Sequence, residues 1–165
     1  MTDTALTDTT TVTVATDTAM RALGSAIAAE VRAGDLILLS GPLGAGKTTF
    51  TQGLAQGMGV RGPVTSPTFA IARTHPSLVG GPDLVHVDAY RLGGPEELDD
   101  LDLEAGLAES VTVVEWGTGM AEWLNDDRLE ISIDRHADDV RTVRVRRVGE
   151  RWRGTLAALA ADELE

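Results

Sequence analysis

The chain has 165 residues, 42% of them hydrophobic, which is enough apolar material for the core of one ordinary domain. Its net charge of −12 should repel polyphosphates over most of the surface, so the chain is a poor candidate for binding nucleic acid alone. Cysteine is absent, which excludes disulfides and thiolate metal sites. With no run of about 18 apolar residues and no basic, apolar leader, we expect a cytoplasmic protein with no membrane span.

The N-terminal stretch is rich in Thr and Asp. We expect residues 1–12 to be a disordered tail ahead of a single domain at residues 13–165. A helix is predicted next, with Thr16 or Asp17 as its N-cap and Gly34 at its end. Apolar residues recur every four positions on one face of this helix, at Ala19, Leu23, Ile27 and Val31.

The middle of the chain alternates between strand and helix patterns. LILLS, residues 36–40, is a continuous apolar run typical of a strand covered on both faces. Residues 48–59 predict a second helix. The segment 61–82 is rich in Gly, Pro and Ser and predicts a loop with a short strand at 69–73. DLVHVDAY, residues 83–90, predicts the next strand.

The last third continues the alternation. Pro95 suits the first position of a helix over residues 95–109, and a short helix or turn is expected around Trp123. Further strands are predicted at residues 111–115, 129–133 and 140–148, the last two antiparallel. A closing helix is expected over residues 151–165. Because strands alternate with helices, we expect an α/β layered fold.

One motif carries recognisable chemistry. Residues 41–48, GPLGAGKT, fit G-x-x-x-x-G-K-[ST] without a gap and lie between a predicted strand and a predicted helix. The three glycines permit backbone torsions that wrap the loop around phosphates, with N–H groups pointing inward. Lys47 would reach the β- and γ-phosphates, and the Thr48 hydroxyl would ligate Mg²⁺. The motif predicts a P-loop NTPase-like domain with a central mixed sheet and flanking helices.

Lys47 is also the only lysine, beside 13 arginines. Two compatible interpretations are a compositional bias towards Arg and a need for a compact ammonium charge at this position, which a planar guanidinium does not supply.

Two carboxylates end predicted strands. Asp88 closes DLVHVD, and Glu115 closes VTVVE. Ligands of open α/β sheets bind beyond the carboxyl ends of the strands, so both side chains are expected to converge on one Mg²⁺–nucleotide. One would bind the metal while the other orients or deprotonates the attacking water. The alternative is that each carboxylate caps a helix or pairs with an arginine.

Other side chains near these strands leave alternatives open. His86 is expected to be a core or crevice histidine, because the three histidines show no metal-ligand spacing. Trp116 either packs in the core, gates the site or meets a partner. Tyr90 and Arg91 either line the site or pack and pair elsewhere. Thr68 lies where a loop would cover the γ-phosphate and sense it.

Two charge clusters remain. Residues 95–109 hold seven acidic side chains and no basic one, and residues 141–153 hold six arginines. Each is explained by a solvated face, and the arginines alternatively by a docking patch for RNA or an acidic protein. The alternation in 140–148 is typical of a half-buried edge strand with charges facing water.

An ordered series of motifs resembles the bacterial TsaE family, the ATPases of threonylcarbamoyladenosine biosynthesis. The series is GPLGAGKTTF at 41–50, SPTF at 66–69, HVDAYRL at 86–92, EEL at 96–98 and VEW at 114–116. Many families share the P-loop, whereas the later motifs are far more specific. The resemblance runs from residue 17 to about residue 133. Residues 71–75 and 117–119 depart from the family pattern, and neither departure touches a phosphate or metal ligand.

The resemblance implies a small ATPase that helps install the threonylcarbamoyl group on adenosine 37 of tRNA. It further implies TsaD-like and TsaB-like partner proteins, tRNA reached only through that complex, and ATP hydrolysis that resets the complex between rounds. By the matching motifs, Glu115 is the metal-ligating Glu, Asp88 lies near the γ-phosphate, and Asp17 lies where the family approaches the base.

The expected site residues follow from the motif and the resemblance together. For catalysis they are Lys47, Asp88 and Glu115. For the nucleotide they are Asp17, Gly41, Gly44, Ala45, Gly46, Lys47, Thr48 and Thr49. For Mg²⁺ they are Thr48 and Glu115.

Two functions of other classes are open to a P-loop chain of this length. A small-molecule kinase needs an Arg-bearing lid, and between the P-loop and the last strands the chain has only Arg61, Arg73 and Arg91. A nucleotide-dependent binding module would use ATP to switch affinity, with hydrolysis incidental.

Overall fold

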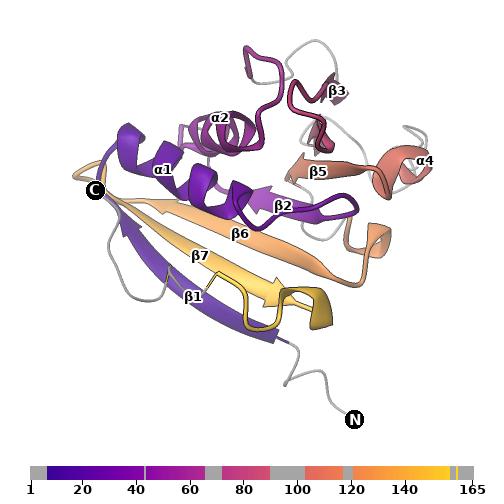
Figure 1. Ribbon diagram of the computed structural model, residues 1–165. Coiled ribbons are helices and arrows are strands. Elements are labelled where there is room, and N and C mark those ends of the chain that lie inside the picture. The colour runs from indigo at the N-terminus through magenta and orange to yellow at the C-terminus, as the bar shows by residue number, and fades with distance from the viewer. Residues whose placement is uncertain are drawn as a thin grey trace.

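The computed structural model describes residues 7–42, 44–65, 72–89, 103–116, 121–156 and 159, and its centre is one mixed sheet (Figure 1). The strands are β1 (Thr7–Val14), β2 (Leu36–Ser40), β3 (Ala72–His75), β4 (Asp83–Asp88), β5 (Ser110–Glu115), β6 (Arg128–Arg135) and β7 (Arg141–Val148). The helices are α1 (Asp17–Ala28), α2 (Lys47–Met58) and α4 (Glu104–Leu107), with short 3-10 helices η3 (Glu122–Leu124) and η4 (Glu150–Trp152). This arrangement confirms the predicted α/β fold.

The seven strands follow the order β1-β7-β6-β2-β5-β4-β3. The centre is parallel, because β2 pairs with both β5 and β6, and β4 pairs with β5 in the same direction. The outer pairs, β1–β7, β6–β7 and β3–β4, are antiparallel. The parallel centre points the carboxyl ends of β2, β4 and β5 to one edge of the sheet, where ligands of α/β proteins bind.

The predicted disordered tail is wrong for residues 7–12. They belong to β1, which pairs along its whole length with β7, from Thr7 opposite Val148 to Val14 opposite Arg141. Val12 and Val14 are buried while Thr11 and Thr13 are exposed, which is the alternation of a half-buried strand. The prediction that β7 is an edge strand is therefore wrong, because β1 pairs with its outer side.

Several predicted elements have different boundaries in the structure. The first helix takes Thr16 as its N-cap and ends at Ala28 instead of Gly34. The short strand expected at 69–73 is β3, at Ala72–His75. The prediction of a closing helix over residues 151–165 is wrong at its start. The 3-10 helix η4 ends at Trp152, and Gly154 has a φ of 72°, which a right-handed helix does not allow. Of the helix expected over 95–109, residues 95–102 lie outside the described residues.

Two apolar cores flank the sheet. The larger core lies between the sheet and helices α1 and α2. The smaller core, on the opposite face, is formed by Leu36, Leu38, Val87, Ala89, Val114, Ala121 and Leu124. No helix of the described residues is long and apolar enough to cross a membrane.

Helices α1 and α2 touch backbone to backbone through glycines. A Cβ built on Gly53 would lie 2.1 Å from the Arg21 carbonyl oxygen, and one built on Gly24 would lie 2.3 Å from the Phe50 carbonyl oxygen. No side chain fits in either place. This close contact holds the N-terminus of α1 beside the N-terminus of α2, where the P-loop ends.

Gly53→Ala should therefore lower the free energy of unfolding by about 1–3 kcal/mol, as overpacking of a close contact does. The sign is diagnostic, because Gly→Ala inside a helix ordinarily stabilises by about 0.5–1 kcal/mol. Urea unfolding would measure the change. The matched control is Gly106→Ala in α4, where an added Cβ meets nothing within 4 Å and should cost nothing. A Gly53→Ala protein as stable as the parent would contradict this close contact between α1 and α2.

Candidate functional site

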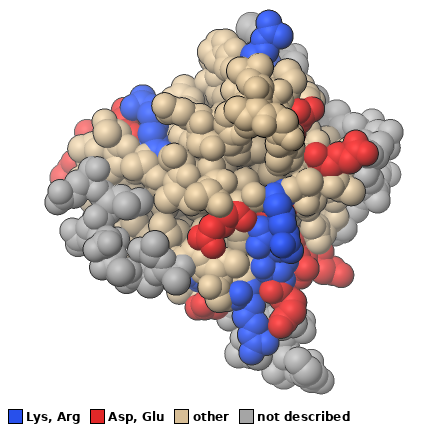
Figure 2. Space-filling view, viewed as in Figure 1, with Lys and Arg blue, Asp and Glu red and all other residues tan. Residues whose placement is uncertain are grey.

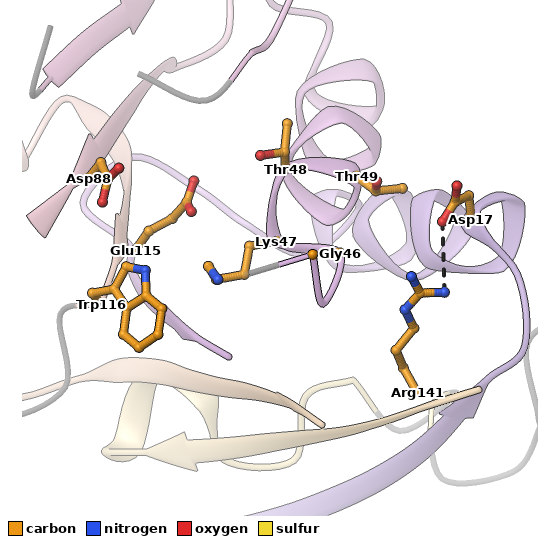
Figure 3. Close-up of a pocket in the computed structure, with 10 residues that line it drawn as sticks. Asp17, Gly46, Lys47, Thr48, Thr49, Asp88, Glu115, Trp116 and Arg141 are labelled. Carbon is orange, nitrogen blue, oxygen red and sulfur yellow. Dashed lines mark ion pairs between the residues drawn. The ribbon is translucent and has the colours of Figure 1, made fainter. Parts of the chain in front are cut away.

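A pocket of about 400 Å³ lies at the carboxyl ends of the central strands, beside the start of α2 (Figure 3). Its lining residues are Asp17, Gly44, Gly46, Lys47, Thr48, Thr49, Asp88, Glu115, Trp116 and Arg141. Eight of the predicted site residues thus come together. The other two, Gly41 and Ala45, do not line the pocket but hold its lysine and its arginine through their backbone carbonyls.

The loop before α2 has the shape that its glycines permit. Gly41 has φ +155°, and a Cβ there would lie 2.7 Å from the Ile133 carbonyl oxygen. Gly46 is the N-cap of α2 in a left-handed conformation, with φ 112°. Having no side chain, it cannot cap the first N–H groups of the helix. These groups and the helix dipole favour an anion at this end of the pocket.

Lys47 is buried, with 6% of its surface exposed. Its Nζ donates to the carbonyl oxygens of Gly41 at 2.6 Å and Pro42 at 3.1 Å. Burial lowers the pKa of Lys47, while the nearby charges of Glu115 and Asp88 oppose that shift. An anion entering the pocket would add to the carboxylates' effect and favour the charged lysine.

The acidic side of the pocket comes from two adjacent parallel strands. Asp88 on β4 stands directly opposite Glu115 on β5, so both carboxylates reach the same edge of the sheet. Glu115 is 4% exposed, and its Oε2 lies 2.5 Å from Nε2 of His86. His86 lies on the same face of β4 as Asp88 and is fully buried, as a core or crevice histidine would be.

Trp116 follows Glu115 in a backbone conformation that is rare for a tryptophan, with φ 64°. Its backbone N–H donates to the Leu39 carbonyl oxygen at 2.8 Å, which fixes the turn at the ends of β2 and β5. The centroid of its ring lies 4.6 Å from Nζ of Lys47, within cation–π range. Of the three open alternatives for Trp116, burial in the core is the one that the geometry disfavours, because the ring lines the pocket.

Arg141 is a pocket residue that sequence reasoning missed. It begins β7, where its Nε donates to the Ala45 carbonyl oxygen at 3.0 Å and its Nη1 lies 3.9 Å from the Asp17 carboxylate. The sequence shows it only as one of six clustered arginines. Pairing of β1 with β7 brings it beside the start of α1, and no local pattern signals that pairing.

The remaining arginines of that cluster are engaged within the chain. Each pairs with an acidic side chain: Arg144 with Asp134, Arg146 with Glu130, Arg147 with Asp8, Arg151 with Asp35 and Arg153 with Glu150. Figure 2 shows basic side chains interleaved with acidic ones on the face it displays. The cluster is therefore a charge-paired surface, which weakens the alternative of a docking patch for RNA.

Sequence comparison identifies the family of the chain. The family model described as "Threonylcarbamoyl adenosine biosynthesis protein TsaE" matches residues 14–143. The chain belongs to the TsaE family. Relatives named "tRNA threonylcarbamoyladenosine biosynthesis protein TsaE" include one from Streptomyces coelicolor, 62% identical over 138 residues, which cover 81% of this chain and 93% of the relative. Another from Bacillus subtilis is 40% identical over 133 residues, covering 80% and 82% of the two chains.

A solved structure has the same fold. The crystal structure of Bacillus subtilis YdiB superposes with a TM-score of 0.72 at 32% sequence identity, covering 88% of this chain and 90% of YdiB. The TsaE motifs quoted above fall on the pocket where the structure describes them, at the P-loop, Asp88, Glu115 and Trp116. Thr68, Tyr90 and Arg91 lie outside the described residues.

The donor set of the TsaE-family pocket fits a nucleotide-bound magnesium better than a metal held by protein alone. Among the described residues, no three His, Cys, Asp or Glu side chains gather into a metal site. At the end of the pocket that holds Lys47, the lining includes the Thr48 hydroxyl and the carboxylates of Asp88 and Glu115 instead. Mg²⁺ prefers such oxygen ligands, few in number and completed by phosphates and water.

Proposed function

We propose that this pocket binds Mg²⁺–ATP and hydrolyses it, and that hydrolysis sustains repeated rounds of threonylcarbamoylation of adenosine 37 in tRNA. The observation that carries the proposal is the convergence of a P-loop with Lys47 and Thr48 on two strand-end carboxylates in one pocket. Membership of the TsaE family links the chain to tRNA threonylcarbamoyladenosine biosynthesis.

The phosphates would lie against the backbone N–H groups at the start of α2. Lys47 would exchange its bonds to the Gly41 and Pro42 carbonyls for bonds to phosphate oxygens. The Thr48 hydroxyl and the Glu115 carboxylate would hold Mg²⁺, which when bound neutralises the developing charge on the phosphates. Asp88 would orient or deprotonate the attacking water.

The other end of the pocket suits the nucleoside. It is lined by Asp17, Thr49 and Arg141. These residues lie on the far side of Gly46 from Asp88 and Glu115 (Figure 3). Arg141 is already held by the Ala45 carbonyl, so its planar guanidinium is pre-oriented to stack on or donate to a ligand.

The partners proposed for this ATPase are TsaD-like and TsaB-like proteins, with tRNA contacted through their complex and the whole assembly in the cytoplasm. The net charge of −12 and the ion-paired arginines support a protein that leaves tRNA binding to its partners.

Reconstituted tRNA modification over several turnovers tests the proposal. Omitting this protein should leave the first round largely intact and stop the later ones, because hydrolysis resets the complex. ATP turnover by the chain alone should be slow and should rise when the partners are added. Phosphate transfer to a small acceptor would indicate a kinase, and support of all rounds by a hydrolysis-deficient variant would indicate a binding module. Either result would contradict the proposal.

A further inference from the structure

We propose that His86 is a positioning residue, which fixes one oxygen of the Glu115 carboxylate so that the other oxygen is presented to the metal. The inference rests on the proposed function, because it assigns Glu115 to Mg²⁺.

The two side chains meet across neighbouring strands. In the β4–β5 register His86 stands opposite Val113, which puts it diagonally across from Glu115 on the same face of the sheet. At this diagonal separation only long side chains reach one another. Nε2 of His86 lies 2.5 Å from Oε2 of Glu115, and the two residues are 0% and 4% exposed. Water therefore has little access to this hydrogen bond.

The ring of His86 makes no other hydrogen bond among the described residues. Nε2 faces the carboxylate, and Nδ1 is buried without a hydrogen-bond partner in the described part of the chain. An apolar side chain would avoid this unpaired nitrogen, whose burial has a cost. Among the described residues, the contact with Glu115 is thus the polar interaction that explains a histidine here.

Holding Oε2 determines what the rest of the carboxylate can do. Figure 3 shows the Glu115 carboxylate directed into the pocket, towards the Thr48 hydroxyl. Lys47 carries an opposite charge that interacts electrostatically with Glu115, but its Nζ donates to the loop carbonyls of Gly41 and Pro42. Without the bond from His86, Glu115 would be free to turn towards the Lys47 ammonium, and both groups would then be less available to metal and phosphate.

Two amide substitutions separate positioning from simple packing. His86→Gln carries an N–H donor near the place of Nε2, whereas the shorter His86→Asn carries it near the place of Nδ1, too far from Glu115. Mn²⁺ serves as the probe, with its binding to the protein–ADP complex measured by electron paramagnetic resonance. ADP binding in EDTA reports the metal-free pocket, and circular dichroism reports folding.

We expect His86→Asn to weaken Mn²⁺ binding by about 10–100-fold, as loss of a hydrogen bond to a metal ligand typically does. His86→Gln should stay within a few-fold of the parent, and both variants should bind ADP in EDTA like the parent. In a Glu115→Gln background, His86→Asn should cause little further loss of Mn²⁺ affinity, because residue 115 no longer supplies a carboxylate for His86 to position.

Equal Mn²⁺ affinity in the Asn and Gln variants would overturn the inference, whether both keep the affinity or both lose it. Unfolding of either variant would also overturn it, since His86 would then be needed for the fold. A parent protein that binds no Mn²⁺–ADP is a different failure, because it would overturn the proposed function itself.

Discussion

Lys47→Ala is expected to lower ATP affinity by about 10–100-fold, the equivalent of one hydrogen bond to a charged group. Turnover should fall further, by about 10²–10³-fold, because the lysine stabilises charge that develops as the phosphate bond breaks. Both effects follow from the position of a buried ammonium at the start of α2, facing the pocket. Calorimetric titration with ATP and a phosphate-release assay would measure them.

Two controls show whether charge alone explains the loss. Lys47→Arg keeps the charge but replaces a compact ammonium with a planar guanidinium in a buried place, so it should not restore turnover. Arg144→Ala removes a positive charge from an exposed ion pair on β7 and should change neither ATP binding nor turnover. Parental ATP binding by Lys47→Ala would refute the P-loop assignment.

The two carboxylates should respond differently to amide replacement. Glu115→Gln should remove the dependence of nucleotide binding on Mg²⁺, because an amide is a poorer metal ligand and carries no charge. Asp88→Asn should leave ATP affinity within a few-fold while lowering turnover by about 10²–10⁴-fold, the usual contribution of a general base. Mg²⁺ titrations of nucleotide binding, followed by single-turnover hydrolysis, separate the two effects.

Asp134→Asn is the matched control for these variants. Its carboxylate is half-exposed on β6 in an ion pair with Arg144, and its loss should affect neither measurement. The reversed pattern, with Mg²⁺ dependence lost at Asp88 and kept at Glu115, would exchange the two roles. Identical losses of Mg²⁺ dependence and turnover in the Asp88 and Glu115 variants would contradict separate roles for the two carboxylates.

Short-range patterns in the sequence were enough to predict the P-loop and the strand ends around it. The glycine spacing at 41–46, the apolar run at 36–40 and the carboxylates that close β4 and β5 are each set by neighbours within a few residues. For that reason the sequence alone predicts that Lys47, Thr48, Asp88 and Glu115 lie at one edge of the sheet.

Pairing between distant segments decided the rest. Residues 7–12 form a strand only because β7 lies alongside them, and the same pairing carries Arg141 to the pocket. The bond from His86 to Glu115 depends on the register of β4 against β5, and the contact at Gly53 depends on how closely α1 approaches α2. Register and helix approach are properties of the packed chain, since a shift of one residue would turn every side chain of a strand to the other face.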